Sequence, residues 1–182
     1  MLKLLGVYGS GAVAGGVAAF DAIASATGTG SSGVITFSSI PADYQHLQLR
    51  IFMRLTANQS NPTLQFNSDT GSNYAKHLLL GNGSVVLATG TASTTSIENN
   101  LRAISTANIG VANIVDIHDY ASTSKYKTVR HFTGWDENGS GQVRLGSGLW
   151  MNTNAINSIT INATTDSFTT DSTFALYGIK GA

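Results

Sequence analysis

The residues that could carry acid–base or metal chemistry are few in this sequence. There are four His, and ten acidic residues balance ten Lys and Arg. The densest polar group is the segment 116–120, in which Asp116 and His118 are separated by one residue. On a strand their side chains would share one face and could act as an acid/base pair or as metal ligands. No third ligand follows at a readable spacing, so we expect solvated or interface side chains, with no metal and no cofactor.

A second short motif, Asp69-Thr70-Gly71-Ser72, matches the active-site signature of aspartic proteases, in which two Asp share one proton. That signature needs an apolar strand that runs directly into the Asp, whereas Asn67 and Ser68 precede it here. We interpret the motif as a turn between two strands. The chain has no Cys to act as a nucleophile and no Gly-x-Ser-x-Gly elbow. We therefore expect a protein that is not an enzyme.

Three aromatic residues, Tyr120, Trp135 and Trp150, suggest a different chemistry. Their flat faces could stack on sugar rings, because such faces beside Asn and Asp suit carbohydrate recognition. The alternative, which we favour, is that these side chains fill the core or a subunit contact. Glycan binding is therefore kept as the second functional hypothesis.

The composition indicates that strands position these residues. Charged residues make up only 11% of the 182 residues, whereas long amphipathic helices take their solvent face from Glu, Lys and Arg. Hydrophobic residues make up 42%, which is enough for one domain with a core. The formal net charge is zero and no basic run occurs, so nucleic acid is not an expected partner. A chain without net charge is also poorly protected against self-association.

The clearest strand lies at residues 46–56, where every second residue is apolar. The apolar positions are Leu47, Leu49, Ile51, Met53 and Leu55. Arg50 and Arg54 lie between them, so one face should meet a core and the other water or a partner. A strand of this kind is typical of a sandwich or a barrel.

Shorter candidate strands follow along the chain. They cover residues 34–39, 63–66, 76–80, 85–88, 112–120, 125–133, 142–150, 156–162 and 173–179. Turns rich in Asn, Asp and Gly separate them, and only the segment 89–107 has no clear pattern. This spacing predicts an all-β fold over residues 34–182, an antiparallel jelly-roll-like β-sandwich of about ten strands.

Residues 1–33 differ from the rest, with an apolar, Gly-rich and Ala-rich run up to Ala26 and a Gly/Ser/Thr linker from Thr27 to Gly33. A secretory signal peptide, a dinucleotide-binding turn around Gly9 and a transmembrane helix are possible interpretations. Asp21 and the many Gly weigh against the signal peptide and the helix. No crossover helix or acidic residue follows at the spacing that a dinucleotide site needs.

We expect instead an extended N-terminal arm that packs against a neighbouring subunit, with an internal strand or short helix of the same domain as the alternative. The expected contact residues of the arm are Leu2, Leu4, Leu5, Val7, Val13, Val17 and Phe20.

The order of several short segments resembles a widespread group of small tailed-phage virion proteins. These segments are residues 34–41 followed by Tyr44 and 47–50, then 66–74, 119–122, 125–128, 148–150, 155–160 and 174–179. The resemblance spans about residues 34–180. It implies a non-enzymatic, multimeric component of the virion, used in capsid decoration (a cement protein) or in tail and fibre parts.

The expected partners follow from this resemblance. They are copies of the chain itself, as a homo-oligomer and specifically a trimer, and other virion proteins such as capsid or tail components. Nucleic acid and membrane are not expected partners. We expect docking through the N-terminal arm and apolar edge regions, and the alternative function is a glycan-binding, receptor-recognition module of a tail fibre.

Overall fold

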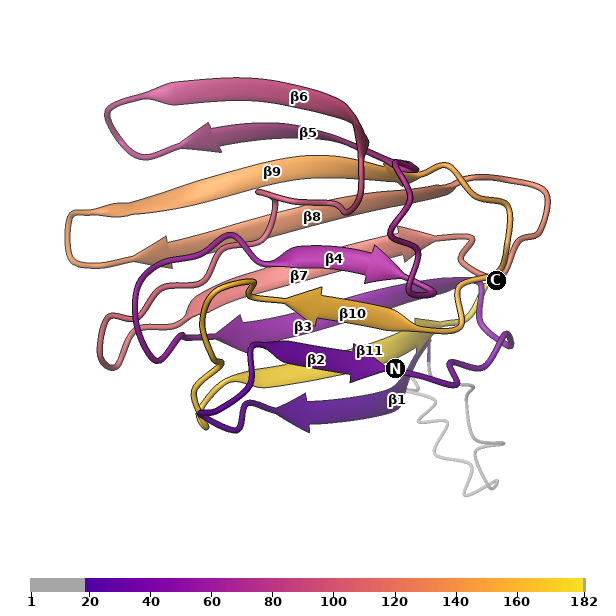
Figure 1. The fold of residues 1–182 in the computed structure, drawn as a ribbon, viewed down its shortest axis with the longest axis horizontal. Coiled ribbons are helices and arrows are strands. Elements are labelled where there is room, and N and C mark those ends of the chain that lie inside the picture. Colours follow the sequence, from indigo (N-terminus) through magenta and orange to yellow (C-terminus); the bar gives the residue numbers. More distant parts are fainter. Residues whose placement is uncertain (1–18, 182) are drawn as a thin grey trace, which may run out of the picture.

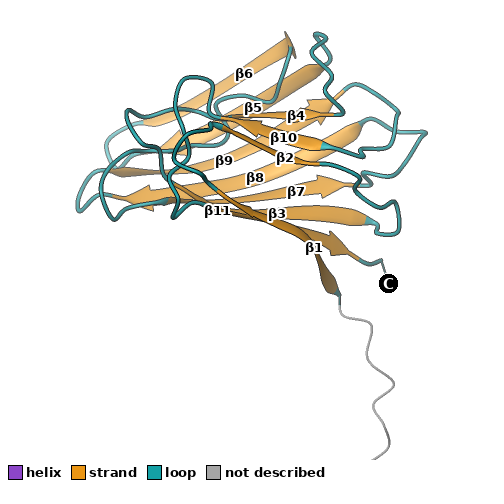
Figure 2. Cartoon of the chain, turned by 60° about the horizontal axis from the view of Figure 1, so that its bottom comes forward, coloured by secondary structure: helices purple, strands orange, loops and turns teal. Residues whose placement is uncertain are grey.

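The computed structural model describes residues 19–181, which contain strands, turns and loops but no helix (Figures 1 and 2). The strands are β1 (Phe20–Thr27), β2 (Val34–Phe37), β3 (His46–Met53), β4 (Thr63–Phe66), β5 (Tyr74–Gly81), β6 (Val86–Thr94), β7 (Val111–His118), β8 (Lys127–Asp136), β9 (Gly141–Trp150), β10 (Ile159–Asn162) and β11 (Thr173–Ile179). Because no described residue is helical, this part of the chain has no helix able to cross a membrane.

Two antiparallel sheets form the predicted all-β sandwich, and this prediction is confirmed. The large sheet has eight strands in the order β1-β11-β3-β7-β8-β9-β5-β6, and the small sheet has three in the order β2-β10-β4. Figure 1 shows the small sheet lying over β11, β3 and β7. The two layers are therefore very unequal in width.

The strand predicted most clearly, β3, has the two faces that its alternation indicates. Leu47, Leu49 and Met53 have no exposed surface, whereas Arg50 and Phe52 are exposed on the opposite face. The buried face belongs to the core between the sheets. The small sheet supplies Ile35, Phe37, Leu64, Phe66, Ile159 and Ile161 to this core.

Tight turns join the strands at the Asn-rich and Gly-rich positions where the sequence predicted turns. Asn138 and Gly139 have φ angles of 60° and 106°, as a type I′ hairpin turn requires, and they connect β8 to β9. Glu137 donates its N–H to the Ser140 carbonyl at 2.6 Å and closes this turn.

The patternless segment 89–107 divides into two parts. Residues 89–94 complete β6. Residues 95–107, which we call the covering segment, lie over the inner face of β8, β9 and β5 where the small sheet ends. Backbone bridges from Leu64 to Ile97 and from Ser60 to Ala103 hold this covering segment beside β4. The segment's own Ile97 and Leu101 are buried against the large sheet. Strand β6 lies beyond this cover and is exposed along almost its whole length.

The predicted domain boundary at residue 33 is wrong for residues 20–27. These residues form β1, which pairs with β11 along its whole length. Ile23 and Ala26 pack against the core, and Asp21 forms an ion pair with Lys180 at 2.6 Å. Small side chains hid this strand in the sequence, because they show almost no alternation of size or polarity.

Candidate functional site

Asp69 lies in a turn between β4 and β5, as the sequence predicted. Its Oδ2 accepts hydrogen bonds from Trp150 Nε1 at 2.8 Å and from Asn73 Nδ2 at 2.9 Å. Its Oδ1 accepts one from the Gly71 N–H at 2.8 Å. Burial acts to raise the pKa of Asp69, but the hydrogen bonds from Trp150, Asn73 and Gly71 outweigh it and lower the pKa. The carboxylate therefore fastens the turn to the core.

Asp116 and His118 lie on the outer face of the large sheet, but they do not form an acid/base pair. Asp116 accepts hydrogen bonds from Gln48 Nε2 at 2.8 Å and from Arg130 Nη2 at 2.9 Å. Burial acts to raise the pKa of Asp116, and these two hydrogen bonds with the Arg130 charge lower it overall. The His118 ring meets His46 edge-on with centroids 5.0 Å apart. Within residues 19–181, no group of three His or acidic side chains could hold a metal ion.

Two of the three aromatic residues lie in the core, as the favoured interpretation expected, so the alternative of sugar stacking is wrong for them. Tyr120 has no exposed surface and Trp150 is 1% exposed. The Tyr120 hydroxyl donates to the Pro41 carbonyl. Trp150 packs against Phe66, with ring centroids 5.6 Å apart. Both faces of these rings are covered by protein, and a sugar could not reach them.

Trp135 is partly exposed but its ring is already engaged. The guanidinium groups of Arg102 and Arg144 lie 5.5 and 5.7 Å from its centroid. Arg144 donates to Asn61 Oδ1 and to the Asn99 carbonyl, both at 2.9 Å. Burial and the charge of Arg102 lower the pKa of Arg144 to about 10. The structure thus gives Trp135 a role in binding two cations of the chain itself.

The outer face of the large sheet carries a group of exposed apolar side chains that we call the outer patch. It consists of Phe52, Leu79, Val86, Ile114, Phe132, Val143 and Leu145. The strand register places these side chains in two adjacent rows. One row crosses β7, β8, β9 and β5 through the paired residues Ile114, Phe132, Leu145 and Leu79. The other runs from Phe52 on β3 to Val86 on β6 across small residues and Val143.

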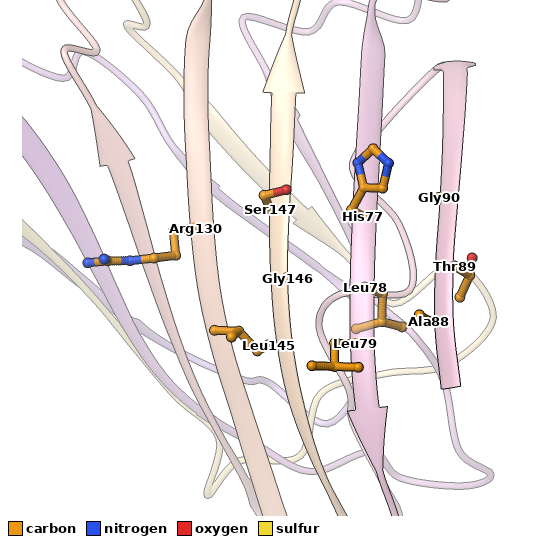
Figure 3. A pocket seen from close by; sticks show the side chains of 10 residues that line it. All are labelled: His77, Leu78, Leu79, Ala88, Thr89, Gly90, Arg130, Leu145, Gly146 and Ser147. Atoms are coloured by element: carbon orange, nitrogen blue, oxygen red, sulfur yellow. The ribbon is translucent and has the colours of Figure 1, made fainter. Parts of the chain in front are cut away.

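A shallow groove of about 670 Å³ crosses part of this face over β8, β9, β5 and β6 (Figure 3). Leu79 and Leu145, which pair across β5 and β9, lie in its middle. Small side chains at Ala88 and Ser147 leave room beside them, as does Gly90. The groove is therefore largely apolar, with few polar groups to orient a small ligand.

A polar row borders the outer patch on one side. Its members pair across the sheet from Gln48 through Asp116, Arg130 and Ser147 to His77. Figure 3 shows Arg130 turned away from the groove, toward the Asp116 carboxylate that it binds. An apolar centre with a polar border is the arrangement found in protein–protein interfaces.

The outer patch was not predicted from the sequence, although the sequence carries one signal of it. Phe52, Ile114 and Phe132 occupy the positions of their strands where the alternation calls for polar residues. Each is unremarkable alone, because single exposed apolar side chains are common. Only the register brings them together. Of the predicted arm residues, Phe20 lies exposed on this same face beside Arg50, and the others are outside the described residues.

Comparisons with known proteins add little to this geometry. No protein family matches the chain, and no curated protein matches it. Among solved structures, it is similar to the crystal structure of a protein of unknown function, SO2946 from Shewanella oneidensis MR-1. The identity is 11%, the match covers 90% of this chain and 77% of that chain, and the TM-score is 0.21.

Proposed function

We propose that this chain is a non-enzymatic structural protein of a tailed-phage virion. It oligomerises and docks on the particle as a capsid-decoration or tail-associated module. The observation that carries this proposal is the outer patch on the large sheet. The resemblance of residues 34–180 to phage virion proteins supplies the kind of particle.

The continuity of the outer patch supports docking rather than a free surface. Its seven side chains are between 40% and 77% exposed, and the strand register sets them in two adjacent rows. Single exposed apolar side chains are normal, whereas contiguous apolar patches with a polar border mark protein–protein contacts. The patch therefore has the character of one side of a protein contact.

The position of the patch also fits an assembly. It lies on the face of the large sheet opposite the small sheet, so a partner could cover it without disturbing the core. The chain has no net charge, and close approach of several copies would meet no overall repulsion. Phe20 is a separate exposed apolar side chain on the same face, because the register places it beyond the polar row.

The test compares two substitutions on the outer face of β8. Phe132→Glu places a charge in the middle of the outer patch, and Thr128→Glu places the same charge on the same strand outside it. Both side chains are exposed, so both variants should fold with unchanged melting temperatures. Docking is measured by co-sedimentation with particles that lack the protein. We expect Phe132→Glu to weaken docking at least tenfold and Thr128→Glu to leave it unchanged. Equal docking of the two variants would contradict the proposal.

A further inference from the structure

Strand β6 is a long open edge whose first six residues, Val86–Thr91, have none of the usual protection against pairing, and a bulge follows them. Its nine residues contain no charged residue and no proline, and eight of them are exposed. Val86 is 77% exposed and Leu87, on the other face, 47%. Exposed edge strands normally carry charges, prolines or bulges that prevent a further strand from adding to the sheet. An edge without these features favours strand addition.

The other edges of the described sheets are protected. Strand β1 is interrupted by a bulge between Ala22 and Ala24 and carries the charged pair of Asp21 and Lys180. Strands β2 and β4 have only four residues each, and the covering segment is bridged to the outer side of β4. Among residues 19–181, β6 is thus the edge best suited to pairing.

The backbone groups that β6 leaves free follow from its hairpin with β5. The Asn82 N–H donates to the Val85 carbonyl at 3.2 Å, which makes these two residues a hydrogen-bonded pair. In an antiparallel ladder, such pairs alternate with pairs whose N–H and C=O groups point away from each other. Leu87 and Thr89 therefore bond to β5. Val86, Ala88 and Gly90 direct their backbone groups to the open side.

We propose that β6 pairs antiparallel with β6 of a second copy of this chain, about a two-fold axis at Ala88. This inference rests on the proposed structural role, and it replaces the trimer expected from the sequence with a two-fold contact between copies, because a three-fold trimer contains no two-fold contact. Residues opposite each other in an antiparallel pair have their side chains on the same face of the sheet, whereas neighbours along a strand have theirs on opposite faces. A two-fold axis between two neighbours would pair side chains of opposite faces, so the axis must pass through a residue. With the axis at Ala88, the free backbone N–H and C=O groups of Val86 face those of Gly90 of the second copy. This axis also stays clear of the bulge, which lies after Thr91.

Self-complementarity of the strand identifies the second copy as the occupant. On the outer face, the exposed Val86 faces Gly90, which has no side chain, and Ala88 faces its own copy. On the other face, Leu87 lies opposite Thr89. No charged side chain of β6 opposes another, whereas a charged peptide would find no complementary charge on the strand. The pairing also joins the outer patches of the two copies, because Val86 belongs to that patch.

A single cysteine provides the first test, because the chain has none of its own. In the full-length Ala88→Cys variant, a disulfide can form only between two chains. Hydrogen-bonded partners in an antiparallel pair have Cα atoms about 5.5 Å apart, within the range that a disulfide spans. Ala24→Cys is the matched control, since Ala24 is an exposed alanine on the opposite edge strand. In a glutathione redox buffer, we expect most of the Ala88→Cys protein to become a covalent dimer at least ten times faster than Ala24→Cys.

Equal rates of cross-linking for the two variants would overturn the pairing. So would a mixed disulfide between Ala88→Cys and Ala24→Cys chains as the main product, because it would indicate head-to-tail addition of β6 to β1. A second variant, Ala88→Lys, sets two like charges beside the axis. We expect it to raise the dimer dissociation constant at least tenfold in analytical ultracentrifugation, with an unchanged melting temperature for the dilute monomer. An unchanged dissociation constant would also overturn the proposal.

These outcomes are separable from failure of the proposed function. If neither cross-linking nor the Ala88→Lys variant indicates pairing while Phe132→Glu still abolishes docking, the β6 contact is wrong and the structural role stands. If the pairing is found but Phe132→Glu docks normally, the docking surface proposed above is wrong instead.

Discussion

At the scale of single residues, the polar groups of this chain hold the fold together. Asp69 binds the indole of Trp150, and Asp116 binds Gln48 and Arg130 across three strands. Hydrogen bonds to a carboxylate contribute more than those between neutral groups. A low content of charged residues is therefore compatible with well-fixed turns and strands.

His131 is the residue whose burial should make stability depend on pH. It is 2% exposed, and its Nε2 has no hydrogen-bond partner within the described residues. Burial, with a smaller effect of the Arg144 charge, lowers the pKa of His131 from 6.5 to about 4. In the unfolded chain His131 binds a proton below about pH 6.5, whereas in the folded chain it does so only below about pH 4. The free energy of unfolding therefore falls as the pH decreases through this window.

We expect the free energy of unfolding to fall by about 3 kcal/mol between pH 6.5 and pH 4 because of this one group. Urea unfolding followed by tryptophan fluorescence across this range measures the loss. The His131→Phe variant has no proton to bind at this position and should give a clearly flatter pH profile, whatever its absolute stability. Parallel profiles of the two proteins would show that His131 is not responsible. The carboxylates with lowered pKa, Asp69 and Asp116, lose their contribution only at lower pH, because their ordinary value is 3.8.

At the scale of elements, the two faces of β3 should respond differently to substitution. Ile51 is 4% exposed and is paired with Phe174 and Asn113. Ile51→Asp would bury a carboxylate with no partner and should cost about 4 kcal/mol of unfolding free energy. Arg50 is exposed and makes cation–π contacts with Phe20 and Tyr177 at 5.8 and 5.6 Å. Its Nε also donates an exposed hydrogen bond to Gln48 Oε1 at 2.9 Å. Arg50→Ala should cost less than about 1 kcal/mol. Chemical denaturation of both variants checks the difference, and similar losses would mean that the strand faces are assigned wrongly.

Strand β1 should contribute to stability although it lies at an edge. A chain that begins at residue 31 loses the pairing with β11, the ion pair of Asp21 and Lys180, and the contacts of Ile23 with the core. We expect its melting temperature to fall by about 10 °C, which corresponds to about 3 kcal/mol in a chain of this length. A chain that begins at residue 19 is the reference for this comparison, so that the difference reports residues 19–30 alone. Calorimetry of the two proteins decides whether β1 belongs to the sandwich energetically as well as geometrically.

Most strands could be located in the sequence because apolar and polar side chains alternate along a half-buried strand. Strands without this alternation were missed. The segments 63–66 and 173–179 were predicted with the bounds that β4 and β11 have. Strand β1 was missed because its side chains are small. The residues 89–94 of β6 were missed because both faces of that strand meet solvent. Phe52, Ile114 and Phe132 were visible as exceptions to the alternation, but their grouping into the outer patch could not be predicted, since it depends on the register of six strands and no local pattern encodes register.

At the scale of the whole molecule, the two sheets divide the chain into regions of different protection. The half of the large sheet that contains β3 and β7 is covered by the small sheet, and Leu49, Val115 and Ile161 have no exposed surface. Strand β6 extends beyond both the small sheet and the covering segment, and only β5 pairs with it (Figure 1). Local stability follows burial and hydrogen bonding. The molecule should therefore open first at β6 and last around β3 and β7.

Hydrogen exchange read by mass spectrometry tests this order and connects it to assembly. In a dilute monomer, we expect peptides from 86–94 to exchange at least a hundredfold faster than peptides from 111–118. The N–H groups of Val86, Ala88 and Gly90 have no partner strand there, whereas β7 is paired on both sides and covered by the core. At concentrations where the chain self-associates, pairing of β6 should slow exchange of 86–94 and leave 111–118 unchanged, because that peptide is already protected.

The Ala88→Lys variant separates pairing from other effects of concentration, and its 86–94 peptide should exchange fast at every concentration. Equal protection of β6 and β7 in the dilute monomer would contradict the uneven stability inferred from burial. Protection of 86–94 at high concentration that persists in Ala88→Lys would assign the association to the outer patch alone.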